Sequence, residues 1–203
     1  SYEESDLVPD ADGRVVGTDA DHLAGATGED PLIVCPPSRR YEVPMAPPMA
    51  ADVLGRLHAC AAERDAGTVV RLTADCPLVD PELLDAVVEE LHREPPCDYA
   101  SNALDRTFPV GLDCEAMTFA ALEAADARAT DPREREHVTP FIYTHPDEFS
   151  VRQVRCDRQL AGHRWTVDTV EDFRLVERVI STLYPVDAEF SWEDVLELVE
   201  RCR

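Results

Sequence analysis

The chain has 203 residues, an apolar fraction of 44% and a formal net charge of −23, which suit one ordinary α/β domain with a sizeable core. All 19 basic residues are arginines. Because so acidic a surface repels nucleic acid and anionic membranes, we expect neither as a partner.

Two origins of the acidic composition stay open. One is adaptation to high salt, in which dense carboxylates keep the protein soluble, and the other is a coding bias that favours arginine and alanine. A melting temperature that rises markedly between dilute buffer and molar KCl would indicate adaptation, because screening relieves self-repulsion. A flat melting temperature would indicate bias. Neither origin implies a cationic substrate.

The seven cysteines are an odd number, and no C-x-x-C motif occurs among them. This pattern argues against a disulfide framework or a zinc site and favours a reducing compartment. No apolar run approaches the roughly 20 residues that span a bilayer, and no signal peptide is visible. We therefore expect a cytoplasmic protein.

The first 50 residues are rich in proline, glycine and aspartate and show little helical periodicity. The stretch around Asp12 and Gly13 predicts a hairpin turn, and the apolar run 31–35 predicts a short buried strand. A proline-rich loop or linker follows. We interpret residues 1–50 as an atypical or diverged N-terminal segment of the same domain as residues 51–203.

From residue 51 onward the sequence becomes regular. Apolar spacing predicts helices over 51–65, 81–94, 119–130, 134–145, 168–183 and 191–202, with a break near Pro140 in the fourth. Alternating or β-branched stretches predict strands over 68–73, 98–102, 113–117, 149–155 and 163–167. Helix starts are predicted at Asp80, at Thr169 and at Ser191. Strands that alternate with helices indicate a layered α/β domain.

A carboxylate follows the predicted strand 68–73. Because side chains alternate along a strand, Arg71, Thr73 and Asp75 share one face if the strand extends by two residues. Asp75 then lies at the carboxyl end of the strand, where α/β sheets gather their ligands. The alternative is that Asp75 only organises the turn that follows.

The predicted strand 163–167 repeats this arrangement. Arg164, Thr166 and Asp168 share a face, and Asp168 directly precedes a helix. By itself Asp168 is equally well explained as a helix-entry residue. Two strands that each end in a carboxylate fit Mg²⁺, which takes one or two carboxylates together with substrate phosphates.

Two further segments are candidates for binding. The turn-forming segment 108–117 places Asp113 and Glu115 on one face, where they bind sugar hydroxyls or metal or else form a solvated pair of acids. The charged segment 131–140 contains Arg135 and His137, although such a run is usually a solvated helix face.

Taken together, these segments resemble, in the same order, the spore-coat polysaccharide type of cytidylyltransferase, which is similar to the synthetases of CMP-linked acidic sugars. The resemblance covers about residues 51–181 and is carried by VVRLTADCPLVDPELLD, DYASN, RTFPVGLDCEAMTFAALEAA, EREHVTPFI and HRWTVDTVEDFRLVE. It implies a three-layer α/β/α nucleotidyltransferase fold, like that of the nucleotide-diphospho-sugar transferases, with a mixed, mainly parallel sheet.

The resemblance also implies transfer of CMP from CTP to a sugar-type hydroxyl, with release of pyrophosphate, by a homodimer. Asp75 and Asp168 match the carboxylates that hold Mg²⁺. The acceptor-sugar region of the family is matched by Asp113 and Glu115. A second segment, which lies near the acceptor or a partner subunit in the family, is matched by Arg135 and His137. By strand parity, Arg71 and Arg164 are the candidate catalytic cations that offset phosphate charge.

One motif of the family has no counterpart in the chain. The family opens with a loop of the form R-x-G-S-x-R-L-P-x-K, which neutralises the triphosphate, and nothing in residues 1–50 matches it. Three explanations stay open. The segment was lost, or it diverged so that Arg39 and Arg40 neutralise the triphosphate instead. In the third, the domain is no longer catalytic and binds a ligand or partner. A glycosyltransferase on a related nucleotide-sugar fold is the remaining alternative.

Overall fold

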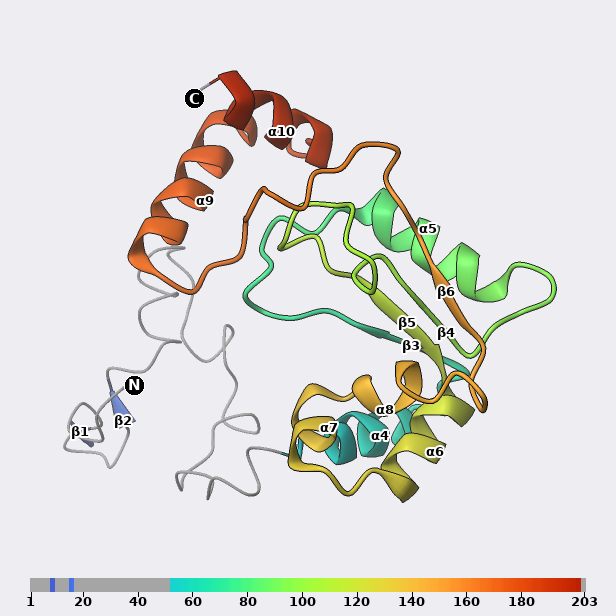
Figure 1. Cartoon of the computed structure of the whole chain (residues 1–203). Coiled ribbons are helices and arrows are strands. Elements are labelled where there is room, and N and C mark those ends of the chain that lie inside the picture. Colours follow the sequence, from blue (N-terminus) through green and yellow to red (C-terminus); the bar gives the residue numbers. More distant parts are fainter. Residues whose placement is uncertain (1–7, 10–14, 17–51, 202–203) are drawn as a thin grey trace. The chain divides into compact units, whose positions relative to one another are not determined.

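The structure is a computed structural model that describes residues 8–9, 15–16 and 52–201 (Figure 1). The chain divides into two units, residues 1–50 and 51–203. In the first unit, strand β1 (Val8–Pro9) pairs antiparallel with β2 (Val15–Val16). The predicted turn at Asp12 and Gly13, the predicted strand 31–35 and the proline-rich stretch lie outside the described residues.

The second unit contains a four-stranded mixed sheet in the order β3-β5-β4-β6. Its strands are β3 (Thr68–Arg71), β4 (Tyr99–Ser101), β5 (Glu115–Thr118) and β6 (Val151–Gln153). Strand β5 is antiparallel to both β3 and β4, whereas β4 and β6 are parallel. Three strands therefore run in one direction and β5 runs against them, which confirms the expected mixed, mainly parallel sheet.

Helices pack on both faces of this sheet and make a three-layer α/β/α unit (Figure 1). One core lies between the sheet and α5, α9 and α10, and the other lies between the sheet and α4, α6 and α8. The helices are α4 (Val53–Glu63), α5 (Pro81–His92), α6 (Phe119–Arg128), α7 (Pro132–His137), α8 (Pro140–Tyr143), α9 (Val170–Leu183) and α10 (Trp192–Arg201).

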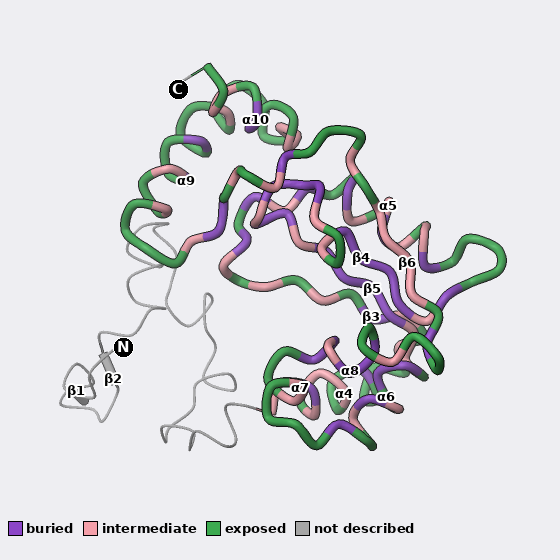
Figure 2. The backbone as a smooth tube through the Cα atoms, in the orientation of Figure 1, coloured by how far each residue is buried: buried purple, intermediate pink, exposed green. Residues whose placement is uncertain are grey.

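Strand parity decides which side chain enters which core. Ala100 and Ala116 belong to the core with α5, whereas Tyr99 and Met117, their immediate neighbours, belong to the core with α4 and α6. The central strands β4 and β5 are buried almost throughout, and the outer strand β6 is only half-buried (Figure 2). Functional groups can therefore reach solvent mainly at the strand ends.

Three predicted helix starts are confirmed. The Asp80 carboxylate accepts the backbone N–H groups of Glu82 and Leu83 at the start of α5, where Pro81 occupies the first position. Thr169 begins α9 with a reciprocal capping box, and the Ser191 hydroxyl donates to a carboxylate three residues on at the start of α10. The predicted helix 134–145 is broken into α7 and α8, as expected near a proline.

Residues 163–167 do not form the continuous strand that their alternation predicts. Only Arg164 forms a bridge, parallel to Val110. The physical reason is that the backbone of this segment bonds to two separate parts of the chain. Trp165 N–H donates to the Val110 carbonyl at 2.7 Å, but Val167 N–H donates to the Asp75 carbonyl at 2.8 Å. No single segment of the chain therefore pairs with all of residues 163–167 by continuous backbone hydrogen bonds.

Five described cysteines, at positions 60, 76, 97, 114 and 156, are free thiols. Burial raises the pKa of the Cys114 thiol to about 12, and nearby carboxylates add to the effect. This thiol therefore stays protonated and packs as a small apolar side chain. Within the described ranges, every helix is too short or too polar to cross a bilayer.

Replacing Thr169 with alanine should lower the free energy of unfolding by about 1 kcal/mol, because the capping box at the start of α9 is lost. Urea denaturation followed by circular dichroism measures this change. The matched control is Thr182→Ala, an exposed threonine inside the same helix, which should be neutral or slightly stabilising. Equal effects of the two substitutions would contradict a capping role for Thr169.

Candidate active site

A polar cleft opens beside the ends of β3 and β4, with a volume of about 520 Å³. Its lining comes from β3 and the loop after it, from β4 and β5, and from the α7–α8 junction. The lining residues are Arg71, Thr73, Tyr99, Ala103, Leu104, Arg106, Asp113, Glu115, His137, Thr139, Pro140 and Tyr143. The cleft therefore unites four predicted site residues, Arg71, Asp113, Glu115 and His137.

Glu115 lies at the centre of a buried hydrogen-bond network in this cleft. The Tyr99 hydroxyl donates to Glu115 Oε1 at 2.5 Å, and the Thr139 hydroxyl donates to the same oxygen at 2.6 Å. Arg71, which faces Glu115 across the β3–β5 pair, forms an ion pair with Oε2. Both carboxylate oxygens are engaged, so Glu115 orients its neighbours and holds the Arg71 guanidinium at the cleft.

The two tyrosines of the cleft stay protonated. Burial raises the pKa of the Tyr99 phenol, and the adjacent Glu115 carboxylate raises it further. Burial and then the same carboxylate also raise the pKa of Tyr143. Both hydroxyls can therefore serve as hydrogen-bond donors but do not act as phenolate bases.

Asp113 is held by an arginine that the sequence analysis did not single out. Arg106 makes a two-pronged ion pair with Asp113, in which one guanidinium nitrogen lies 2.8 Å from Oδ2. The hydrogen bond that Arg106 donates to the Asp113 carboxylate raises the pKa of Arg106. Arg106 lies two residues before the turn-forming segment 108–117, and only the fold of that turn brings it to Asp113.

A glycine shapes this turn. Gly111 has φ of 104°, a conformation that favours glycine, and its α-carbon lies against the backbone of Trp165 and Thr166. A Cβ atom there would lie 2.7 Å from the Trp165 carbonyl carbon and 2.8 Å from the Thr166 nitrogen. Gly111 therefore lets the segment that carries Asp113 pack directly on the segment that ends in Asp168.

Asp75 and Asp168 lie on adjoining segments, although neither residue ends a regular strand. The link between the two segments is the hydrogen bond from Val167 N–H to the Asp75 carbonyl. Asp168 forms an ion pair with Arg164, and its Oδ2 accepts the Thr166 hydroxyl at 3.2 Å. These contacts confirm that Arg164, Thr166 and Asp168 share a face.

Carboxylates on two adjoining segments are the kind of ligand that would suit Mg²⁺. Asp75 is half-buried and Asp168 is exposed, so both are accessible to a hydrated cation and a phosphate ligand. Across the part of the chain that the structure describes, no three His, Cys, Asp or Glu side chains form a ready-made metal site. Two protein carboxylates suit an ion that takes its remaining ligands from phosphate and water.

The cleft and the Asp75 segment are directly connected. The Thr73 hydroxyl lines the cleft and lies 3.2 Å from the Cys76 thiol, which in turn contacts the Asp75 carboxylate at 3.8 Å. Thr73, which lines the cleft, is therefore linked to the Asp75 carboxylate through the Cys76 thiol.

Arg135, for which the sequence predicts a role near the acceptor or a partner subunit, is not among the residues that line the cleft. Its guanidinium donates to the Asp52 carboxylate at 2.8 Å and to the Asp126 carbonyl at 2.7 Å, and it also pairs with the Asp126 carboxylate. Arg135 therefore ties α7 to the start of α4 and to α6. Sequence spacing could not reveal this, because Asp52 lies far away in the chain and Asp126 lies on another helix.

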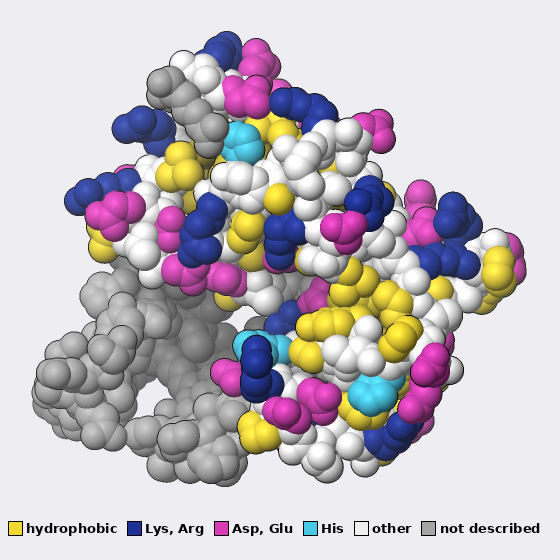
Figure 3. Space-filling model, in the orientation of Figure 1, with side chains coloured by type: hydrophobic (Ala, Val, Ile, Leu, Met, Phe, Trp, Pro, Cys, Tyr) yellow, Lys and Arg dark blue, Asp and Glu magenta, His cyan; other side chains and the backbone are white. Residues whose placement is uncertain are grey.

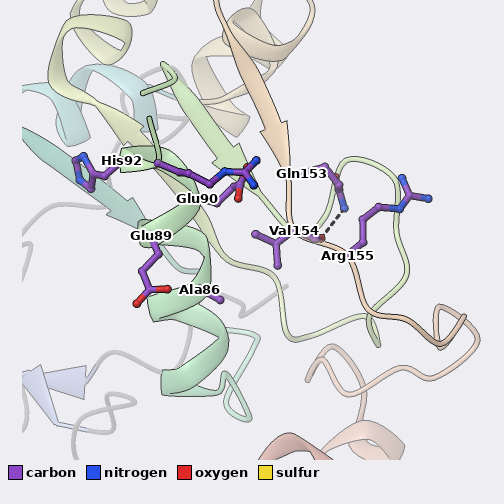
Figure 4. A pocket seen from close by; sticks show the side chains of 8 residues that line it. Ala86, Glu89, Glu90, His92, Gln153, Val154 and Arg155 are labelled. Atoms are coloured by element: carbon purple, nitrogen blue, oxygen red, sulfur yellow. Dashed lines mark hydrogen bonds and ion pairs between the residues drawn. The ribbon is translucent and has the colours of Figure 1, made fainter. Parts of the chain in front are cut away.

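A second cavity, of about 640 Å³, lies between α5 and β6 (Figure 4). Both of its arginines already have partners, since Arg93 pairs with Glu90 at 2.6 Å and Arg155 pairs with Asp105. The Gln153 amide donates to the Val154 carbonyl at 3.0 Å. None of the predicted site residues lines it, so the chemistry is assigned to the cleft beside β3.

Over the face of the molecule drawn in Figure 3, carboxylates and guanidinium groups are interspersed rather than segregated. The two arginines of the cleft are also paired with carboxylates, Arg71 with Glu115 and Arg106 with Asp113. The cleft therefore offers oriented N–H donors with little net charge.

Comparison with known proteins gives concordant matches. A family model described as cytidylyltransferase matches residues 35–191. An uncharacterised protein of Methanocaldococcus jannaschii is 39% identical over 126 residues, which cover 61% of this chain and 50% of that protein. The spore coat polysaccharide biosynthesis protein SpsF of Bacillus subtilis is 32% identical over 114 residues, covering 54% and 45%.

A solved structure, a cytidylyltransferase from Leptospira borgpetersenii, superposes with a TM-score of 0.69 at 32% sequence identity. The match covers 74% of this chain and 63% of that one. The chain spans about half the length of the curated relatives it matches.

Proposed function

The chain belongs to the cytidylyltransferase family, and from this membership we infer that it transfers CMP from CTP to a hydroxyl of an acidic sugar or related acceptor, with release of pyrophosphate. The product would serve cell-surface polysaccharide or natural-product biosynthesis. The observation that supports the proposal is the hydrogen bond from Val167 N–H to the Asp75 carbonyl, which joins the segments that carry Asp75 and Asp168.

In this proposal the two ends of the site have separate tasks. Asp75 and Asp168 hold Mg²⁺, which when bound offsets charge on the reacting phosphates. The cleft holds the acceptor, with Arg71 positioned by Glu115 to donate to an anionic group of the ligand. Arg164, beside Asp168, is the second cation available to the phosphates. Positioning and charge neutralisation are the main sources of rate in such a transfer.

We further propose that turnover by this chain is slow. CTP carries about four negative charges and the two aspartates add two more, of which one Mg²⁺ offsets only two. No stretch of the sequence matches the basic loop that faces these charges in the family. Arg71 and Arg164 must offset part of the remainder, and both already pair with carboxylates.

The missing basic loop also favours a second candidate function. In this alternative, the chain is a non-catalytic cytidylyltransferase-like domain that binds a ligand or partner. Its retained carboxylate pair would then serve binding without turnover. By analogy with related synthetases, we propose a cytoplasmic homodimer in either case.

The test is to incubate the purified chain with CTP, Mg²⁺ and a panel of sugar acids and to measure pyrophosphate and the CMP-linked product. We expect product at a rate below about 1 per second, the lower end of ordinary enzyme turnover. No product with any acceptor, combined with Mg²⁺-dependent CTP binding, would overturn the enzymatic proposal in favour of the binding domain.

A further inference from the structure

The junction between α7 and α8 contains a strained backbone turn. Val138 has φ of 73° and ψ of −62°, and Thr139 N–H donates to the His137 carbonyl at 2.9 Å. These values define a γ-turn with positive φ at its centre, which is rare and strained, especially for a β-branched residue. Strain of this kind persists only where the surrounding structure enforces it, and it concentrates at functional sites.

Three contacts enforce this turn. The Val138 side chain is fully buried in the core with α4 and α6, and its N–H closes α7 by donating to the Glu134 carbonyl at 3.0 Å. On the other side, the Thr139 hydroxyl is bound to Glu115 in the cleft. The turn thereby fixes His137, directly before it, at the edge of the cleft.

His137 differs from every other ionisable acceptor that lines the cleft. Both oxygens of Asp113 are engaged by Arg106, and both oxygens of Glu115 are engaged by its three partners. The two tyrosines stay protonated. Among the described residues, the exposed imidazole of His137 makes no hydrogen bond or ion pair with another side chain, so its acceptor nitrogen is available to a ligand.

We propose that His137 is the general base of the transfer. Its imidazole nitrogen takes the proton from the acceptor hydroxyl as that oxygen forms a bond to the α-phosphorus of CTP. The bond from the α-phosphorus to the bridging oxygen of the β-phosphate breaks, and pyrophosphate leaves with that electron pair. Histidine is the side chain most often used for such proton transfer. This inference rests on the proposed function and adds the residue that activates the acceptor.

The test compares the 203-residue chain with its variants His137→Ala and His137→Gln, using CTP labelled at the α-phosphate and the best sugar acid from the panel. Both substitutions should lower product formation about 10²- to 10⁴-fold, the usual contribution of a positioned base. Millimolar imidazole should restore much of the rate to His137→Ala, whose side chain leaves room for it, but little to His137→Gln. Mg²⁺-dependent CTP binding should not change.

The matched control is His92→Ala, an exposed histidine on α5 outside the cleft, which should keep the wild-type rate with and without imidazole. A wild-type rate in His137→Ala, or a loss that imidazole does not restore, would overturn the role of His137 while leaving the proposed function intact. A wild-type chain that forms no labelled product would overturn both proposals.

Discussion

Replacing Asp168 with asparagine is expected to abolish the Mg²⁺-dependent part of CTP binding and to lower turnover about 100-fold or more. The reason is that a metal at the reacting phosphates supplies several kcal/mol of charge stabilisation, and each 1.4 kcal/mol corresponds to roughly a factor of ten in rate. Calorimetric titration with CTP in the presence and absence of Mg²⁺, together with the product assay, measures both effects.

Because Arg164 and Asp168 form an ion pair, the substitution should affect CTP binding differently with and without Mg²⁺. Without the Asp168 carboxylate, Arg164 loses its nearest described partner and keeps its weaker ion pair with Asp172, at 3.7 Å. CTP binding in the absence of Mg²⁺ should therefore become tighter in Asp168→Asn, while binding in its presence becomes weaker. The control is Glu171→Gln, which removes one exposed negative charge three residues away. The same response in both variants would show a general charge effect and contradict a metal-binding role for Asp168.

Replacing Gly111 with alanine is expected to destabilise the protein by about 3 kcal/mol or more, since the new side chain combines backbone strain with steric overlap. At φ of 104° a side chain is disfavoured, and the neighbouring atoms at 2.7 and 2.8 Å belong to the backbone of Trp165 and Thr166, which cannot move aside cheaply. Trp165 is buried in the core, so relief of the overlap also disturbs the packing there.

Urea denaturation of Gly111→Ala and of a matched glycine variant measures this effect. Gly162→Ala is the control, because a Cβ atom at Gly162 meets nothing within 4 Å, and its stability should stay near that of the wild type. Any Gly111→Ala protein that remains folded should also bind Mg²⁺ and CTP more weakly, because the Asp113 and Asp168 segments separate. A stability close to that of Gly162→Ala would contradict the close packing of these segments.

Periodicity and capping signals predicted most of the fold from residue 51 onward. The helix starts at Asp80, Thr169 and Ser191 were predictable because a capping side chain acts within three residues of itself. Strand parity also grouped Arg164 with Asp168 correctly, even though residues 163–167 are not a continuous strand. An extended backbone alternates its side chains whether or not a ladder forms beside it.

The parts of the site that sequence could not predict depend on contacts between distant residues. Glu115 appeared as one of two acids on a strand face, but its role is set by Tyr99 and Thr139, which reach it from β4 and the α7–α8 junction. Arg135 and His137 belong to one sequence motif, but the Arg135 side chain binds Asp52, whereas His137 lines the cleft. The γ-turn at Val138 has no sequence signal, because valine is disfavoured in that conformation.

The most direct test of the central claim, that Asp75 and Asp168 make a Mg²⁺-dependent CTP site, is calorimetric titration of the full chain with CTP. The titration is run with Mg²⁺ and without it, for the wild type and for Asp168→Asn. We expect weak binding, in the millimolar range, that requires Mg²⁺ in the wild type and loses that requirement in the variant. Binding that is equally strong with and without Mg²⁺ in the wild type, or unchanged by Asp168→Asn, would contradict it.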